Sequence, residues 1–376
     1  MASIKLKGDT SGEVTISAPA VAGTTTLELP ATSSTLATQN ALGVRNLIIN
    51  GDMRIAQRGT SVTGVVTSGY KIIDRFTYIR ADDSATSQEQ STDAPDDAEY
   101  SYKITVTTPD ATVDGTQYSH LRHIIEGLNT AHLRWGSSNA KTITVSFWVK
   151  SSITGTYCLG LANDDFDRQY IKEYTINSAN TWEKKTITIS GDTTGTWKTD
   201  NDRGINVYWK LSAGSDLHGV EGWQSSSPAG RKMATSNQVN FVGTTNATFQ
   251  LALTQLEVGD TATPFEHRPY DMELARCQRY YQCNFAGSWG QAYNSTTGVM
   301  GIKFHQPMRT TPSISQKSGI TRTIDVVGGT QTPTNITLGS SGSNTQVTTM
   351  VSGLSGRTTW QAIGIFDTGT EYNAEL

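Results

Sequence analysis

Two aromatic residues, Trp148 and Tyr208, lie where the sequence predicts the solvent side of a strand. The aliphatic residues around each ring fall on the opposite parity. Because successive side chains of a strand point to opposite faces, both rings are expected to leave the hydrophobic core. An exposed ring can stack on the C–H face of a sugar. We therefore predict carbohydrate binding at these residues; the alternative is packing against a neighbouring subunit or beneath a loop.

Three other side chains carry the oxygen ligands that Ca²⁺ prefers. Asn50 and Asp52 precede the first strands of a predicted β region, and Glu257 follows its last strand. A structural calcium ion could bind there, and we expect no other cofactor. The alternative is that these are ordinary surface groups.

A histidine-containing stretch offers a weaker case for a metal. His120, His123 and Glu126 are close in the sequence, and His132 follows. They do not form the HExxH pattern, and on a strand His120 and His123 would point to opposite faces. We expect surface histidines here and no metal site.

The chain carries no recognisable catalytic motif. It has no GxSxG, no P-loop and no cysteine in a papain-like context. A carboxylate pair for glycan cleavage is defined by its spacing in the fold, so the sequence leaves that alternative open. We predict a protein that is not an enzyme.

The candidate residues belong to an all-β pattern. Alternating segments predict strands at 70–78, 100–106, 141–150, 187–189 and 205–211. Short strands with turn-rich connections favour a jelly-roll β-sandwich. Residues 121–133 fit either a strand or a helical turn. Residues 81–99 and 212–237 are expected to be long polar loops.

Residues 249–283 are expected to connect this sandwich to a second β region. Alternation predicts a strand after Phe249, proline residues then interrupt it, and Asp271 is placed to cap a short helix. Further strands are predicted at 299–304, 320–327, 345–351 and 360–366. The predicted regions are an N-terminal arm (1–44), a jelly roll (45–268), a linker with a short helix (269–283) and a small C-terminal β-sandwich (284–376).

The arm has too few apolar residues to fold alone. Its aliphatic anchors are Ile4, Leu6, Val14, Ile16, Leu27 and Leu29. At about 1.5–3 kcal/mol per buried side chain, these do not offset the entropy of ordering the backbone. We predict an extended β arm that other chains order; the alternative is a flexible leader.

Composition excludes several classes of protein. Charged residues make up 17% of the chain and the net charge is −4, which argues against nucleic acid as a partner. No apolar run is long enough for membrane insertion, and the first residues lack a signal core, so we expect synthesis in the cytoplasm. Cys158, Cys277 and Cys283 are too few for a disulfide framework and are expected to be buried thiols.

Three segments resemble parts of tail-fibre-like proteins of tailed bacteriophages. Residues 255–282 (QLEVGDTATPFEHRPYDMELARCQRYYQ) resemble the joint between a jelly roll and a C-terminal domain. Residues 46–53 (NLIINGDM) and 70–76 (YKIIDRF) are similar to the opening of that sandwich. Residues 7–12, 18–23 and 27–30 resemble an N-terminal arm of phage tail proteins.

The resemblance implies a virion protein: a tail fibre that attaches to a host surface glycan or protein through multivalent binding. It also implies a homotrimer, an arm (1–44) that binds phage tail or capsid proteins, and assembly in the host cytoplasm. Carbohydrate-binding jelly rolls share this architecture, and some hold Ca²⁺ between their first and last strands. The alternative is a head-decoration fibre or a tail connector without receptor binding.

Overall fold

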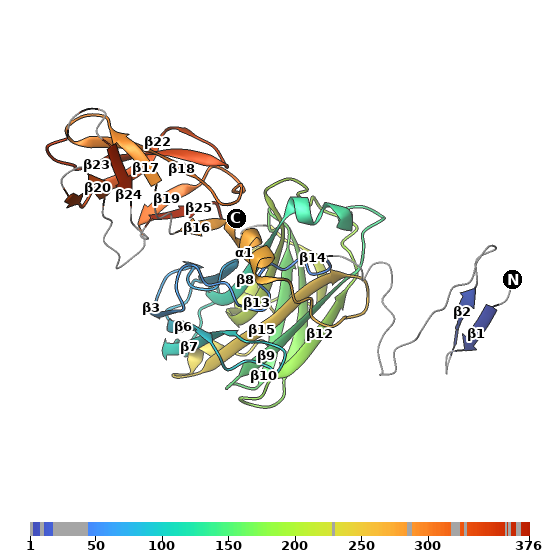
Figure 1. Cartoon of the computed structure of the whole chain (residues 1–376). Helices are drawn as coiled ribbons and strands as arrows, with labels where there is room; N and C mark the ends of the chain where they lie inside the picture. The colour runs from blue at the N-terminus through green and yellow to red at the C-terminus, as the bar shows by residue number, and fades with distance from the viewer. Residues whose placement is uncertain are drawn as a thin grey trace. The chain divides into compact units, whose positions relative to one another are not determined.

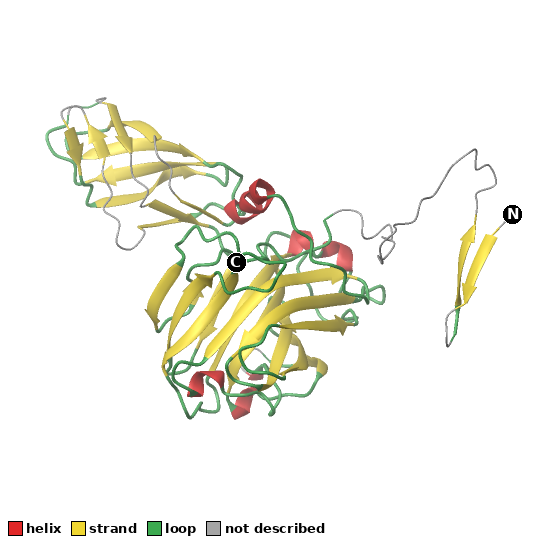
Figure 2. Cartoon of the chain, turned by 60° about the horizontal axis from the view of Figure 1, so that its bottom comes forward, coloured by secondary structure: helices red, strands yellow, loops and turns green. Residues whose placement is uncertain are grey.

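The computed structural model describes residues 3–7, 11–17, 44–227, 230–283, 288–316, 324–326, 329–357, 359, 362–365 and 370–376. The chain divides into two units, residues 1–43 and 44–376. Figure 1 labels the elements along the chain, and Figure 2 shows strands as the main regular structure, with helix confined to short segments.

The first unit contains a two-stranded antiparallel hairpin of β1 (Ser3–Lys7) and β2 (Glu13–Ser17). Its register pairs Ile4 with Ile16 and Leu6 with Val14. The Lys5 ammonium forms an exposed ion pair with the Glu13 carboxylate at 2.7 Å. An isolated two-stranded hairpin is marginally stable in water. The predicted anchors Leu27 and Leu29 lie outside the described residues.

The second unit begins with thirteen strands. They are β3 (Ser61–Val65), β4 (Gly69–Tyr70), β5 (Phe76–Arg80), β6 (Ala85–Ser91), β7 (Ser101–Thr108), β8 (Tyr118–Glu126), β9 (Ile143–Ser151), β10 (Gly155–Ala162), β11 (Arg168–Ile176), β12 (Glu183–Ile189), β13 (Arg203–Ala213), β14 (Gly222–Ser225) and β15 (Thr248–Val258). Short 3₁₀ turns are η2 (Gly127–Asn129), η3 (Ala131–Leu133), η4 (Ser215–Leu217) and η6 (Phe241–Gly243).

These strands form two antiparallel sheets that share one core. The seven-stranded sheet has the order β14-β11-β10-β13-β8-β5-β4, and the six-stranded sheet has the order β12-β9-β15-β7-β6-β3. Alternate residues of both sheets point into the core, for example Val145 and Phe147 on β9, and Val207 and Trp209 on β13. The predicted all-β fold with a central sandwich is therefore confirmed.

The structure places a strand in each of the two predicted loops. Residues 212–237 contain β14, which pairs with β11. Residues 81–99 contain β6, which pairs with β3 and β7. Its inward side chains are polar: Thr86 and Gln88 are buried, and the Gln88 side chain accepts a hydrogen bond from the Tyr102 hydroxyl at 2.6 Å. A strand that buries polar side chains lacks the apolar alternation from which strands are predicted.

Residues 121–133, which fitted either a strand or a helical turn, contain both. The strand β8 continues to Glu126, and the 3₁₀ turns η2 and η3 follow it. The alternation expected in β15 also changes midway, because a register shift follows Ala252 and Leu253 has φ 46°. This bulge places Leu256 in the main core, where unbroken alternation from Phe249 would not have put it.

The described residues of the C-terminal part form two further antiparallel sheets. Its elements are α1 (Tyr270–Gln278), β16 (Tyr281–Cys283), β17 (Ser288–Ala292), β18 (Thr297–Lys303), β19 (Ser313–Gln316), β20 (Ile324–Val326), β21 (Gly329–Gln331), β22 (Asn335–Gly342), β23 (Gln346–Ser352), β24 (Ala362–Ile365) and β25 (Thr370–Asn373). The sheet orders are β16-β25-β19 and β21-β20-β24-β17-β18-β23-β22. Part of the predicted strand 320–327 and part of 360–366 lie outside the described residues.

The helix α1 lies where the sequence predicted it, but its first turn differs. Pro269 occupies the N-cap, so Asp271 lies within the first turn and no side chain caps the helix. Proline is favoured near a helix start because its fixed φ suits that position. Cys277 on α1 is buried, as are Cys158 and Cys283, which agrees with the expected buried thiols.

A buried ionic network connects the sandwich to the end of the chain. The Glu375 carboxylate binds the Arg58 guanidinium at 3.2 Å and also pairs with Arg75. Arg58 in turn binds Asp74 at 3.2 Å. The Arg75 guanidinium lies 3.4 Å from the ring centre of Tyr280. Glu375 and Asp74 together balance the charges of the two buried arginines, and the pairs made by Glu375 hold the last residues against the sandwich.

Replacing Glu375 by glutamine should lower the free energy of unfolding by about 3–5 kcal/mol, because the buried Arg75 would lose its Glu375 partner and Arg58 would keep only Asp74. Chemical denaturation of the two proteins would measure the difference. The control is Glu221→Gln, which removes an exposed partner of Lys172 and should cost less than about 1 kcal/mol. Equal effects of the two substitutions would contradict the buried network.

Candidate functional site

The two predicted sugar-binding aromatics lie on different sheets. Trp148 belongs to β9 of the six-stranded sheet, and Tyr208 belongs to β13 of the seven-stranded sheet. Each strand turns its alternate residues toward the shared core, so the two rings lie on opposite outer faces of the sandwich. A single site therefore cannot contain both. Trp148 is half-buried.

Tyr208 is not exposed, in contrast to the expectation from its parity. Its exposed fraction is 5% because residues 231–233 pass over the outer face of the seven-stranded sheet. The sequence left open the alternative that the ring packs beneath a loop, and this alternative is correct for Tyr208. Gly160 on β10 makes room for it, since a Cβ there would lie 3.2 Å from a ring carbon of Tyr208.

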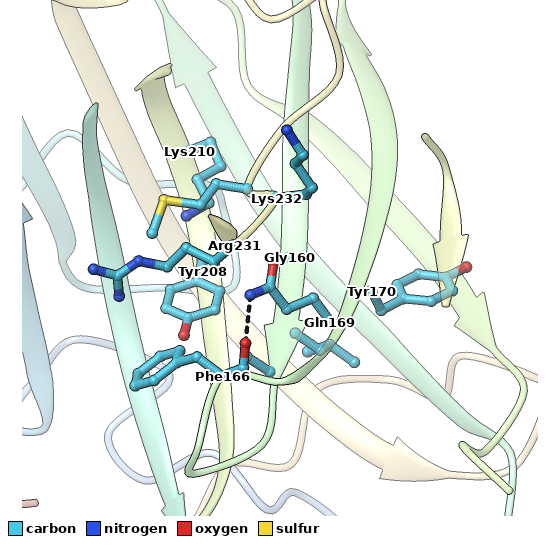
Figure 3. A pocket seen from close by; sticks show the side chains of 11 residues that line it. Gly160, Phe166, Gln169, Tyr170, Tyr208, Lys210, Arg231 and Lys232 are labelled. Atoms are coloured by element: carbon cyan, nitrogen blue, oxygen red, sulfur yellow. Dashed lines mark hydrogen bonds between the residues drawn. The ribbon is translucent and has the colours of Figure 1, made fainter. Parts of the chain in front are cut away.

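A pocket remains between the sheet and this covering segment (Figure 3). Gln169, Tyr208 and Lys210 line it from the strands, and Phe166 and Arg231 line it from the connecting segments. In Figure 3 the Tyr208 ring lies at the centre of the group, with its hydroxyl toward Phe166. We call this cavity the outer-face pocket.

Cationic and aromatic groups alternate at the base of the outer-face pocket. The Lys210 ammonium lies 4.2 Å from the Tyr208 ring centre and 3.3 Å from Nδ1 of His120. The His120 ring meets Tyr208 edge-on at 4.8 Å and stacks on Tyr118 at 5.5 Å. Cation–π contacts of this kind hold positive charge against a ring when water is excluded.

Two arginines add positive charge at the same place. The Arg231 guanidinium lies 5.4 Å from the Phe166 ring centre and 5.7 Å from that of Tyr118. Arg122 follows His120 by two residues on β8 and pairs across the sheet with Tyr208. Within the described ranges, no carboxylate forms an ion pair with Arg122, Arg231 or Lys210.

Several buried polar atoms around the pocket have no hydrogen-bond partner among the residues that the structure describes. They are His120 Nε2, Arg122 Nε, Gln169 Oε1, Asn206 Oδ1 and Tyr208 Oη. The amide nitrogens of Gln169 and Asn206 are fixed by the backbone oxygens of Phe166 at 2.8 Å and Asn163 at 3.0 Å. Of the two residues only Gln169 lines the pocket, where its amide oxygen can accept a hydrogen bond from water or from a bound molecule.

The burial of these groups changes their acid–base behaviour. Burial lowers the pKa of the Lys210 ammonium well below its usual value, and the charges of Arg231 and Arg122 act in the same direction. The pKa of His120 is likewise well below its usual value, mainly through burial and then through Lys210. The site holds its positive charge at a cost in free energy that an incoming anion would reduce.

The residues proposed for calcium bind protein groups. The Asn50 amide donates to the backbone oxygens of Ile55 and Asp74, both at 2.9 Å. Asp52 pairs with Arg54. Among the described residues there is no group of three or more His, Cys, Asp or Glu side chains that could hold a metal ion.

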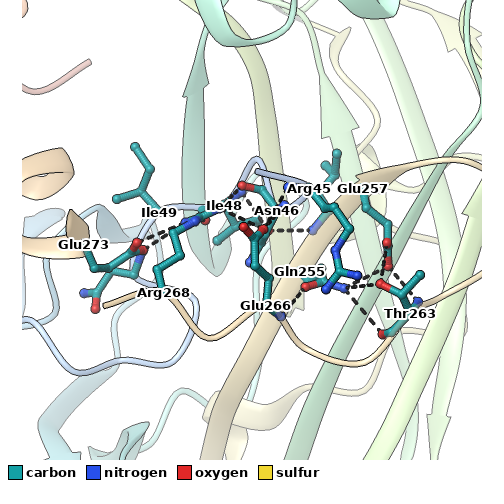
Figure 4. A network of polar contacts seen from close by, with 12 residues as sticks. Arg45, Asn46, Ile48, Ile49, Gln255, Glu257, Thr263, Glu266, Arg268 and Glu273 are labelled. Atoms are coloured by element: carbon teal, nitrogen blue, oxygen red, sulfur yellow. Dashed lines mark hydrogen bonds and ion pairs between the residues drawn. The ribbon is translucent and has the colours of Figure 1, made fainter. Parts of the chain in front are cut away.

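Glu257 stabilises the turn that follows β15. It accepts hydrogen bonds from Gln255 at 2.8 Å and from the Thr263 hydroxyl at 2.7 Å. Figure 4 shows Glu257 beside Thr263, while Glu273 on α1 binds Arg268. The calcium site stays a prediction, and these contacts give each residue a structural role.

The expectation of surface histidines is wrong for the pair on β8. His120 and His123 are both buried, and they point to opposite faces as their spacing predicted. His123 lies against the backbone of Ile49 and the ring of Phe76, whereas His120 lies in the outer-face pocket. Glu126 accepts a hydrogen bond from Tyr280 at 2.6 Å. His132 is exposed.

A second aromatic group, which the sequence analysis did not identify, closes one side of the sandwich core. The Trp135 ring centre lies 4.7 Å from that of Trp197 and 5.4 Å from that of Trp223. The Trp135 and Trp223 indoles donate to backbone oxygens at 2.8 Å, and the Trp197 indole donates to Asp192 at 3.2 Å. All three indole N–H groups are used internally, and the Trp197 and Trp223 rings pack against the main core, to which Trp135 belongs.

Comparisons with known proteins give only distant structural likenesses. No protein-family model and no curated protein matches the chain. In the described residues no helix is long and apolar enough to cross a membrane.

The similar solved structures include the enzymatically active domain of tailspike protein 4 of bacteriophage CBA120 (10% identity, TM-score 0.29, covering 57% of this chain and 21% of that one). Another is a putative sugar-binding protein from Bacteroides thetaiotaomicron (14% identity, TM-score 0.29, covering 57% of this chain and 100% of that one). A third is a family 11 carbohydrate-binding module from Clostridium thermocellum in complex with a mixed-linked tetrasaccharide (11% identity, TM-score 0.28, covering 55% of this chain and 97% of that one). At these TM-scores the likeness does not indicate function.

Replacing Lys210 by methionine should raise the free energy of unfolding at neutral pH by about 1–2 kcal/mol, because a buried and poorly satisfied amine is removed. The gain should shrink as the pH rises toward 10.5, the usual lysine pKa. In that range the amine of the unfolded wild-type chain also loses its proton, so the lower pKa of Lys210 in the folded chain no longer reduces stability.

Denaturant midpoints measured from pH 7 to pH 10 would check this prediction. The control is Lys184→Met, at an exposed position of β12, which should change stability by less than about 0.5 kcal/mol. If Lys210→Met were less stable than the wild-type protein, burial of the Lys210 amine would not be unfavourable.

Proposed function

We propose that this chain is a non-enzymatic attachment protein of a tailed-phage virion that binds a host surface glycan through the outer-face pocket. The observation that carries the proposal is the set of buried polar atoms there that lack partners among the described residues. A buried polar group left without any partner costs about 1–3 kcal/mol, so these atoms need water or a ligand, and a ligand with many hydroxyls can satisfy several of them at once.

Binding is favoured over cleavage by the chemistry of the pocket. Glycoside hydrolysis in most families needs two carboxyl groups that flank the scissile bond. The described side chains lining the outer-face pocket include Tyr208, Lys210 and Arg231 but no aspartate or glutamate. The pocket can therefore donate and accept hydrogen bonds without providing that acid–base pair.

The phage assignment rests on the order of the three sequence segments that resemble tail-fibre-like proteins. In this proposal residues 1–44 attach the protein to tail or capsid proteins, and the chains assemble as homotrimers in the host cytoplasm before incorporation into virions. The marginal stability expected of an isolated β1–β2 hairpin supports a role for partner chains in the arm. Weak sites on several subunits would together give firm attachment.

Substitutions at the rim of the pocket would test glycan binding. On an array of bacterial surface polysaccharides, Phe166→Ala and Tyr118→Ala should each weaken binding about tenfold, equivalent to about 1.4 kcal/mol, through lost ring contacts. Both residues are half-buried, so truncation should preserve the fold. Trp148→Ala on the opposite face is the control and should leave binding unchanged.

If Trp148→Ala alone abolished binding, the six-stranded sheet would be the binding face. If the wild-type protein bound no polysaccharide and labelled protein bound only to capsid or tail connector, the alternative structural role without receptor binding would replace this proposal.

Removing residues 1–44 would test the role of the arm. Sedimentation of the truncated and full-length proteins should give different assembly states, with the full-length chain forming the larger species. If both proteins sedimented with the same number of subunits, the arm would not be what holds the subunits together.

A further inference from the structure

We propose, building on the proposed glycan binding, that the outer-face pocket receives the negatively charged substituent of an acidic saccharide, a carboxylate or a phosphate. The inference rests on three features of the pocket: restricted access, uncompensated positive charge and unpaired hydrogen-bonding atoms. A neutral sugar would use only the last of these.

Access to the pocket excludes a flat sugar ring from its base. Tyr208 is 5% exposed and Lys210 is 0% exposed, because the segment containing Arg231 and Met233 covers them. A pyranose ring stacked on Tyr208 would need an uncovered ring face. A small substituent that projects from the sugar can approach the same polar atoms without that area, so the base of the pocket suits a charged group of a few atoms.

The charge of the pocket is positive and lacks an ion-pair partner among the described residues. Lys210 Nζ and the His120 ring meet at 3.3 Å, and the half-buried guanidinium groups of Arg122 and Arg231 lie near the same tyrosine. Arginine binds carboxylate and phosphate through a planar fork of N–H donors. An anion would thus find several donors that are already held in place.

The carboxylates near this face are engaged elsewhere. Glu173 accepts hydrogen bonds from the Thr235 hydroxyl and from Asn237 at 3.0 Å. Asp164 pairs with Arg203 at 2.6 Å, and Asp167 accepts a hydrogen bond from Asn163, also at 2.6 Å. Because these carboxylates bind other groups, the positive charge of the pocket is available to an anionic ligand.

The rim of the pocket provides contacts for the rest of a saccharide. Arg231 lies between the rings of Phe166 and Tyr118, and all three side chains are half-buried. Gln169 lines the pocket, and its free amide oxygen can accept a hydrogen bond from a sugar hydroxyl. The arrangement therefore combines donors for an anion with acceptors for hydroxyl groups.

Anion binding should be accompanied by proton uptake. The groups that face Lys210 are Tyr208 on its own strand, His120 and Arg122 on β8, Cys158 on β10, and Arg231. An anion raises the pKa of the Lys210 and His120 side chains, whereas a neutral sugar does not. Affinity for an acidic saccharide should therefore increase as the pH falls, until the ligand itself becomes protonated.

Titration calorimetry of the full-length protein with matched ligands would test the proposal. Trigalacturonate should bind at least tenfold more tightly than its methyl ester, which has the same sugar backbone without the charges. Glucose 6-phosphate compared with glucose tests the phosphate form of the anion. Repeating the titrations in buffers of different ionisation enthalpy would measure the proton uptake.

Two variants make the test specific for the pocket. Arg231→Gln removes a cation that has no carboxylate partner in the described part of the chain, and it should lower the affinity for the acidic ligand at least tenfold. Lys172→Gln makes the same change in net charge on β11, at an exposed ion pair with Glu221, and should have no effect. Unchanged thermal unfolding of Arg231→Gln would verify that the fold is intact.

The outcomes separate this inference from the proposed function. Equal binding of charged and neutral ligands, with no effect of Arg231→Gln, would overturn the acidic ligand and leave glycan binding in place. Binding of glucose 6-phosphate and inorganic phosphate with equal affinity, but of no saccharide on the array, would support an anion site and overturn the glycan. Loss of trigalacturonate binding only in Lys172→Gln would place the site elsewhere.

Discussion

The middle of the seven-stranded sheet is buried on both faces, and this constraint determines the character of the site. Its inner face contributes Val207 and Trp209 to the apolar core. Its outer face would be exposed in a simple sandwich, but residues 231–233 cover the middle of it. Polar side chains that suit a solvent face, such as Lys210 and Asn206, are consequently removed from water. The Gln169 amide oxygen and the Tyr208 hydroxyl line the pocket beneath this cover, lack hydrogen-bond partners among the described residues and can bind a polar ligand.

The scaffold around the pocket is well suited to hold those groups in place. The strands β8 and β13 pair along most of their length, so the side chains of His120 and Arg122 have fixed positions relative to Tyr208 and Lys210. The covering segment is fixed as well: Ala234 packs on Cys158, and the Thr235 hydroxyl donates to Glu173. A rigid site loses little conformational entropy when a ligand binds, so even a few contacts can produce measurable affinity.

The sequence predicts the sheets better than it predicts the site. Clear alternation on β9 and β13 identifies the inward residues, because burial of apolar side chains dominates the pattern. The same alternation placed Tyr208 in solvent, since parity says which face a residue occupies and does not say what covers that face. The cover comes from residues 231–233, a polar stretch without periodicity. Likewise β6 was missed because it buries Thr86 and Gln88, and the bulge at Leu253 follows no sequence signal.

The treatment of buried cations elsewhere in the chain strengthens the functional interpretation of the pocket. Arg58 pairs with Asp74 and Glu375, Arg168 with Asp192, and Arg268 with Glu273. The fold thus supplies a carboxylate wherever one of these arginines leaves water, which avoids the penalty of an isolated buried charge. In the described structure Lys210 has no such carboxylate, although it is fully buried. A buried amine that weakens the fold and gains a counter-charge only when an anion binds is better explained by a ligand site than by a structural role.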